Sequence, residues 1–275
     1  MKTNITNTIV AASAFLLSAP FSHGATVALG TSSIVRSGSL LTSVTVNSTT
    51  YTSATMVLPT ISAFAGGNST TLLGPDSGQN NGTVITYSAA QRRAFLETDF
   101  DLNTGIINPS TATDGLSGTF STPIKNTLGT NFVLFEIAPT VDQLADRFFI
   151  SFNGGSFFEV AGTAYGKTNF TTNSETLDTR NAADNGSITA GTLNDLLTSN
   201  LRIQTNFIDQ SVWGIGLDFS DYGVAADADV SSFTIRAFDA SNRVDPVFIA
   251  GLIPEPSVAL SSVLGLAMIA LRRKR

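Results

Sequence analysis

The sequence predicts an all-β fold for residues 26–250, a single β-sandwich with a few short helices. Three observations predict it. Short runs of β-branched and aromatic residues alternate with Gly, Asn, Asp, Ser and Pro, which is the pattern of strands separated by turns. The 19 Phe residues and 42% apolar content can fill a large core, whereas only 13% of residues are charged and Cys is absent.

The clearest strand is Val212–Phe219, in which apolar and small or polar side chains alternate from one residue to the next. Two other runs, Phe132–Ile137 and Arg147–Phe152, are apolar on both faces and predict central strands. Asn153-Gly154-Gly155 predicts a hairpin turn before a strand at Ser156–Val160. The remaining predicted strands are Ser231–Phe238, Val27–Val35, Leu40–Val46, Thr50–Leu58 and Thr83–Tyr87.

Helix signals are short. Ser88 and Gln91 have the spacing of a capping box before Arg92–Leu96. Thr140 precedes Val141–Asp146 and Thr192 precedes Leu193–Leu197 in the same way. Residues 66–82 and 168–191 are polar and predict loops. No long linker divides the body, so we expect one domain.

The N-terminal residues 1–25 have the features of a secretory signal peptide. Lys2 precedes an apolar stretch, and small residues follow it. We expect signal peptidase to cleave after Gly24 or Ala25.

The C-terminal residues 253–275 combine three features in order. A Pro-Glu-Pro segment comes first, an apolar run at 257–271 follows, and a basic tail at 272–275 ends the chain. The run is shorter than the roughly 20 residues of a typical spanning helix, but it is flanked by cations that would stay on the cytoplasmic side. The residues of the motif and tail are Pro254, Glu255, Pro256, Ser257, Arg272, Arg273, Lys274 and Arg275.

This arrangement resembles the PEP-CTERM sorting signal of Gram-negative bacteria. The resemblance implies recognition by an exosortase-like membrane enzyme, an inner-membrane intermediate held by the C-terminal helix, and then release or attachment at the cell surface, often near exopolysaccharide. The resemblance implies where the protein is delivered and how its tail is processed, but it implies no molecular activity. Residues 212–252 are also similar to the ends of bacterial surface proteins with this tail, which implies a jelly-roll or lectin-like sandwich.

The charge of the exported body excludes one class of partner. Without Lys2 and the four basic tail residues, 10 of the 15 Lys and Arg residues remain against 21 acidic residues, a net charge near −11. Such a surface repels nucleic acid.

Several catalytic classes are excluded by composition. His23 is the only histidine and lies in the signal peptide, so the mature body has neither His nor Cys. Ser-His-Asp and Cys-His systems and the usual zinc sites are therefore absent, and we expect no enzyme. Residues 161–168 match a relaxed phosphate-loop pattern, but the residues that follow are poor helix formers.

We expect no cofactor, with calcium as the alternative. Asp99, Asp101 and Asn103 place oxygen ligands at alternate positions, as calcium loops do, although the EF-hand pattern fails. A second acidic cluster comprises Asp218, Asp221, Asp227 and Asp229.

Two carboxylates lie within apolar strands. Glu136 and Glu159 could support glycoside hydrolysis at a suitable separation. The simpler expectation is that each faces solvent or pairs with a cation such as Arg147. Trp213 lies on the apolar face of its strand and is expected in the core, which weakens a lectin function that needs exposed stacking platforms. The sequence thus favours an exported structural or adhesive protein, with a carbohydrate-binding module as the alternative and a hydrolase third.

Overall fold

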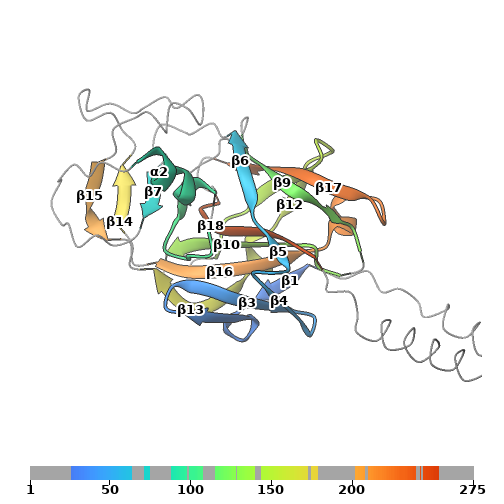
Figure 1. Ribbon diagram of the computed structural model, residues 1–275, viewed down its shortest axis with the longest axis horizontal. Coiled ribbons are helices and arrows are strands. Elements are labelled where there is room, and N and C mark those ends of the chain that lie inside the picture. Colours follow the sequence, from blue (N-terminus) through green and yellow to red (C-terminus); the bar gives the residue numbers. More distant parts are fainter. Residues whose placement is uncertain are drawn as a thin grey trace, which may run out of the picture.

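The computed structural model describes residues 26–63, 71–74, 88–97, 99–107, 115–127, 129–139, 144–172, 175–178, 202–207, 210–239, 242 and 244–253. Within them every strand pair is antiparallel, in four sheets, and helices are few and short, so the all-β prediction is confirmed (Figure 1). The six-stranded sheet contains β1 (Val27–Leu29), β5 (Met56–Val57), β10 (Phe132–Pro139), β13 (Gly166–Thr172), β16 (Gln210–Leu217) and β18 (Pro246–Leu252). The five-stranded sheet contains β6 (Pro59–Ala63), β9 (Gly115–Lys125), β11 (Phe148–Phe152), β12 (Phe158–Val160) and β17 (Asp229–Ala237).

Two smaller sheets and four short helices complete the described elements. The three-stranded sheet contains β2 (Ile34–Ser37), β3 (Leu40–Val46) and β4 (Thr49–Thr52). The four-stranded sheet contains β7 (Thr71–Gly74), β8 (Gly105–Ile107), β14 (Glu175–Asp178) and β15 (Arg202–Phe207). The helices are α2 (Ala89–Leu96) and the 3-10 turns η1 (Thr31–Ser33), η2 (Gly162–Ala164) and η3 (Phe219–Tyr222).

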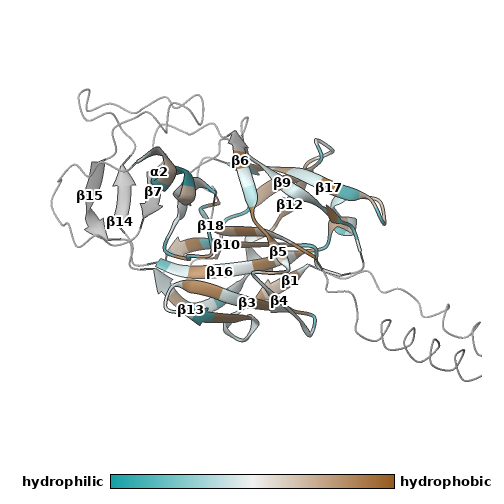
Figure 2. Cartoon of the chain, in the orientation of Figure 1, coloured by the Kyte–Doolittle hydropathy of each residue, from teal (hydrophilic) through white to brown (hydrophobic). Residues whose placement is uncertain are grey.

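The six-stranded sheet is covered on both faces. Along β10, Phe132 and Leu134 belong to a core shared with the five-stranded sheet. The alternate residues Val133, Phe135 and Ile137 belong to a second core shared with the three-stranded sheet. Every residue of β18 is buried as well, and Figure 2 shows hydrophobic segments on these strands. The prediction that Phe132–Ile137 is a central strand is confirmed, and its cause is burial of both faces.

The single sandwich predicted from the sequence therefore needs a correction. The five- and six-stranded sheets form a sandwich, and the three-stranded sheet adds a third layer on the outer face of the six-stranded one. Gly214 allows close packing on the face of the six-stranded sheet that the added layer covers: a Cβ there would lie 2.4 Å from the ring of Phe135 and 3.0 Å from the Cβ of Leu29.

Most of the predicted strands are present, but several boundaries are wrong. Val27–Val35 is interrupted by η1, and Thr50–Leu58 is broken by a turn in which the Thr55 amide donates to the Thr52 carbonyl. The predicted loops at 66–82 and 168–191 contain β7, β14 and most of β13. Asn153 and Gly154 have φ angles of 50° and 69°, which confirms the predicted turn between β11 and β12.

The helix predictions have mixed outcomes. The capping box is confirmed, since the Gln91 amide donates to the Ser88 hydroxyl while the Gln91 side chain accepts from the Ser88 amide. The described part of Val141–Asp146, residues 144–146, is not helical. Thr83–Tyr87 and the Thr192 helix lie outside the described residues, as do the signal peptide and residues 254–275. No helix in the described part of the chain is both long and apolar enough to span a membrane.

Candidate functional site

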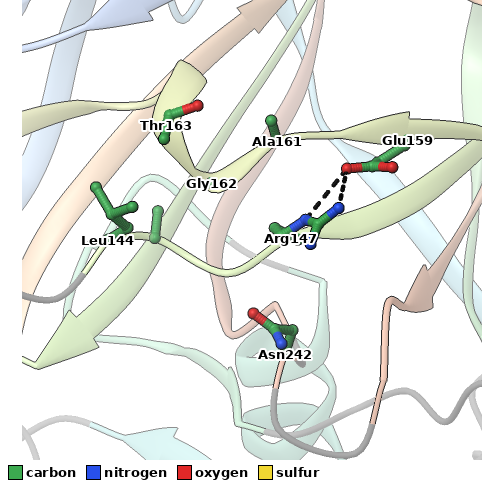
Figure 3. Close-up of a pocket in the computed structure, with 8 residues that line it drawn as sticks. Leu144, Arg147, Glu159, Ala161, Gly162, Thr163 and Asn242 are labelled. Carbon is green, nitrogen blue, oxygen red and sulfur yellow. Dashed lines mark hydrogen bonds and ion pairs between the residues drawn. The ribbon is translucent and has the colours of Figure 1, made fainter.

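A pocket of about 390 Å³ lies where β11 begins and where β12 and β17 end. One side is formed by Leu144 and Thr163, and another by the Arg147–Glu159 ion pair, with Asn242 below (Figure 3). The remaining lining residues are Ala145, Ala161 and Gly162. Its volume lies within the roughly 300–1,000 Å³ range of small-molecule sites.

The backbone at the pocket floor is closely packed around Gly162. A Cβ at that position would lie 2.0 Å from the Ala145 carbonyl oxygen. The η2 turn therefore rests directly on the segment that leads into β11, and only glycine permits this approach. This contact places Thr163 on the same side of the pocket as Leu144 (Figure 3).

The Arg147–Glu159 ion pair uses two nitrogens of the arginine but only one oxygen of the glutamate. Both Nε and Nη2 of Arg147 donate to a single oxygen of Glu159, Oε1, the first at 3.1 Å. Neither Nη1 of Arg147 nor Oε2 of Glu159 bonds to any other described residue. The two side chains are 44% and 41% exposed, so both remain accessible to solvent at the edge of the pocket.

The pocket borders an outward-facing row of aromatic rings and guanidinium groups on the five-stranded sheet. Phe149 is paired across the sheet with both Glu159 and Arg236, so these three side chains share one face. The Arg147 guanidinium lies 3.8 Å from the centroid of the Phe238 ring, and that ring stacks on Phe149 at 5.4 Å. On the same face, Arg236 lies 3.9 Å above the ring of Phe157. Aromatic contacts of this kind hold the two arginines in fixed orientations.

The expectation for Glu159 is confirmed, because it pairs with Arg147, but the expectation for Glu136 is wrong. Glu136 is fully buried, neither solvent-facing nor paired with a cation, and its Oε1 accepts the Asp146 backbone amide at 2.6 Å. Burial raises its pKa well above the ordinary value, the charges of Asp146 and Asp245 raise it further, and hydrogen bonds from both backbones oppose the rise. Glu136 does not line the pocket that contains Glu159, so that pocket does not assemble the carboxylate pair of the hydrolase hypothesis.

Glu136 lies in a buried polar cluster at one end of the core. Its Oε2, the hydroxyl of Tyr165 and Nε1 of Trp213 have no hydrogen-bond partner among the described residues. Burial raises the pKa of Tyr165 strongly, and the neighbouring charges of Glu136 and Asp146 add to this. Trp213 is half-buried and packs against the core, close to its predicted place, with Lys167 Nζ 5.4 Å from its ring centroid.

The proposed calcium residues lie together in one turn. Asp99 Oδ1 accepts the Asp101 amide and the Thr104 hydroxyl, both at 2.8 Å, and Asp101 Oδ1 accepts the Asn103 amide at 2.9 Å. Burial raises the pKa of Asp99. In the described part of the chain no group of three or more Asp, Glu, His or Cys side chains could hold a metal ion. Calcium here stays a prediction that a melting curve with and without chelator can test.

The four aspartates of the second acidic cluster differ in burial. Asp218 is fully buried and caps η3 through the Ser220 amide, whereas Asp221, Asp227 and Asp229 are exposed. The structure explains Asp218 as a helix cap rather than as a ligand.

The phosphate-loop pattern at residues 161–168 has no phosphate-loop structure. The 3-10 turn η2 is followed by strand β13, where a helix would be needed, and the Thr168 hydroxyl donates to the Val212 carbonyl at 2.7 Å.

The sorting residues and the cleavage residues Gly24 and Ala25 lie outside the described residues. Leu144, Thr163 and Asn242 were not proposed as site residues from the sequence, and Thr163 was noted only as part of the phosphate-loop pattern at residues 161–168. Comparisons of the chain with protein-family models, with curated proteins and with solved structures give no match.

Proposed function

We propose that the chain is an exported structural or adhesive component of the cell surface or extracellular matrix of a Gram-negative bacterium. In this proposal signal peptidase removes the N-terminal segment, and an exosortase-like membrane enzyme processes the C-terminal one. The protein then associates with exopolysaccharide.

The observation that carries the proposal is the position of the last described strand, β18, relative to the Pro-Glu-Pro segment. The Leu252 amide donates to the Asn131 carbonyl at 2.7 Å, and the Ile253 amide donates to the Thr55 carbonyl at 2.9 Å. The next residue is Pro254, the first of the Pro-Glu-Pro segment. A cut within or after that segment would therefore leave every described strand intact, which supports a separable sorting tail.

We also propose a jelly-roll topology for the sandwich. The order β5-β18-β10-β16 in one sheet and β9-β17-β11-β12 in the other supports it, because consecutive strands of this set, except the hairpin β11–β12, lie in opposite sheets, as in two Greek keys. Jelly rolls include lectin domains, but a fold does not determine a function.

The test of sorting is replacement of Pro254, Glu255 and Pro256 by Ala in the natural host. We expect the variant to keep its hydrophobic tail and to stay in the membrane fraction, as intact mass and fractionation would show. Asp221→Ala, an exposed change in the folded body, is the control and should be processed normally. Normal processing of the triple variant would contradict the proposal.

A carbohydrate-binding module is the second candidate function. The pocket beside the Arg147–Glu159 pair favours it, because it combines planar polar groups with an exposed apolar side chain, Leu144. Sites for sugars and other small polar ligands combine these elements.

A further inference from the structure

We infer that the pocket formed by Leu144, Arg147, Glu159, Thr163 and Asn242 binds an uncharged sugar ring of a polysaccharide. This inference rests on the carbohydrate-binding function proposed above and adds the ligand class and the residues that select it.

The first argument is charge. Arg147 and Glu159 neutralise each other within the pocket. A carboxylate on an acidic sugar would have to compete with Glu159 for the guanidinium, and the exported body has a net charge near −11. Both effects oppose an anionic ligand, whereas a neutral ring avoids them.

The second argument is the supply of donors and acceptors. Arg147 keeps Nη1 as a donor and Glu159 keeps Oε2 as an acceptor, since their bond uses Nε, Nη2 and Oε1 alone. Each sugar hydroxyl can donate one hydrogen bond and accept others, so neighbouring hydroxyls match this donor and acceptor. Such hydrogen bonds to charged groups are stronger than those between neutral groups.

The third argument is pre-organisation. The Arg147 guanidinium lies on the Phe238 ring, which itself stacks on Phe149. An arginine already held in place loses less side-chain entropy when a ligand binds. On the other side of the pocket, Leu144 is 60% exposed, so its apolar side chain is available to contact the C–H face of a sugar ring.

The experiment measures retention of the full chain, purified in detergent, on two immobilised polymers: a neutral galactomannan and alginate, a polymer of uronic acids. We expect galactomannan to retain the protein. Leu144→Ala and Thr163→Val should each weaken retention, Leu144→Ala by about ten-fold. Glu159→Gln should weaken galactomannan binding and strengthen alginate binding, because it removes the negative charge that neutralises Arg147. Asp221→Asn removes an exposed charge away from the pocket and should change neither.

Each possible result supports or overturns the inference that the pocket binds a neutral sugar ring. Galactomannan retention that the pocket variants lose and Asp221→Asn keeps supports the inference. Retention that no pocket variant changes overturns this site but leaves a carbohydrate-binding function standing. Stronger retention of the unaltered protein by alginate overturns the neutral class of ligand. Retention by neither polymer overturns the site and the carbohydrate-binding function together, while sorting is judged by its own test.

Discussion

The two cores on either face of the six-stranded sheet differ in composition. The core shared with the five-stranded sheet is rich in aromatic rings, and Phe132 lies at its centre, 5.3 Å from Phe233 and 5.5 Å from Phe152. The core shared with the three-stranded sheet is mainly aliphatic, with Leu41, Val44 and Val46 on its outer side.

This difference in composition shows that the two faces of the six-stranded sheet are packed in different ways. Rings from both large sheets interlock in the first core, whereas in the second core short side chains pack and Phe135 fits over Gly214. We therefore expect the aromatic core to contribute more to stability per residue, and the aliphatic core to be sensitive to added volume.

The largest expected effect is in the aromatic core. Phe132→Ala should lower the free energy of unfolding by about 3–5 kcal/mol, because it leaves a cavity among four rings. Val44→Ala in the aliphatic core should lower the free energy of unfolding by about 2 kcal/mol. The change removes two methyl groups, at about 0.8 kcal/mol each, and leaves a small cavity. Denaturant titration measures both, and equal losses would contradict the comparison.

The next effect concerns added volume in the aliphatic core. Gly214→Ala should cost about 1–3 kcal/mol, because the new methyl group meets the Phe135 ring and the Leu29 Cβ. Thr119→Ala, at an exposed strand position, is the control and should cost far less. A neutral result for Gly214→Ala in thermal unfolding would show that Phe135 can move aside.

The third effect depends on pH and on the buried carboxyl of the aromatic core. The pKa of Glu136 is raised in the folded state, so the folded protein holds a proton that the unfolded chain releases above its ordinary pKa of 4.5. The contribution of Glu136 to the free energy of unfolding is fully present below pH 4.5 and is lost as pH rises through the pKa of the folded state. Each pH unit between the pKa of the unfolded chain and that of the folded protein lowers the free energy of unfolding by about 1.4 kcal/mol.

Glu136→Gln should remove most of this dependence, since the amide keeps an oxygen to accept the Asp146 amide but cannot ionise. We expect the variant to lose less stability than the unaltered protein between pH 4.5 and pH 8, as paired denaturant titrations would show. Asp146, Asp245 and Tyr165 face Glu136 and remain in both proteins. Parallel pH profiles would contradict the assignment to Glu136.

Strands with strong periodicity could be predicted from the sequence. Leu40–Val46 matches β3 at both ends, and Val212–Phe219 matches β16 to within two residues. The prediction extended the second strand too far because Asp218, which reads as one more alternating residue, caps η3 instead. The long strand β9 was missed, because Gly118 and Pro123 are typical of turns.

The site was harder to predict than the strands. Arg147 and Glu159 are 12 positions apart, and pairing them required only the β11–β12 hairpin. Asn242 lies after the end of β17, the other neighbour of β11, and Leu144 lies in an irregular segment. Such contacts depend on sheet order, which local periodicity does not encode. Glu136 was misplaced although its strand was predicted to be central, because a buried carboxyl that accepts a backbone amide, here that of Asp146, has no signal in the local sequence.

The position of β18 has a mechanical consequence. This strand lies between β10 and β5, and the chain leaves it at Ile253. Hydrogen bonds in an antiparallel sheet run perpendicular to the strands, so tension on a surface tether would pull along β18 and load its bonds together in shear. Shear resists force better than the one-by-one opening of an edge strand. In the surface attachment proposed above, this geometry would therefore resist tension.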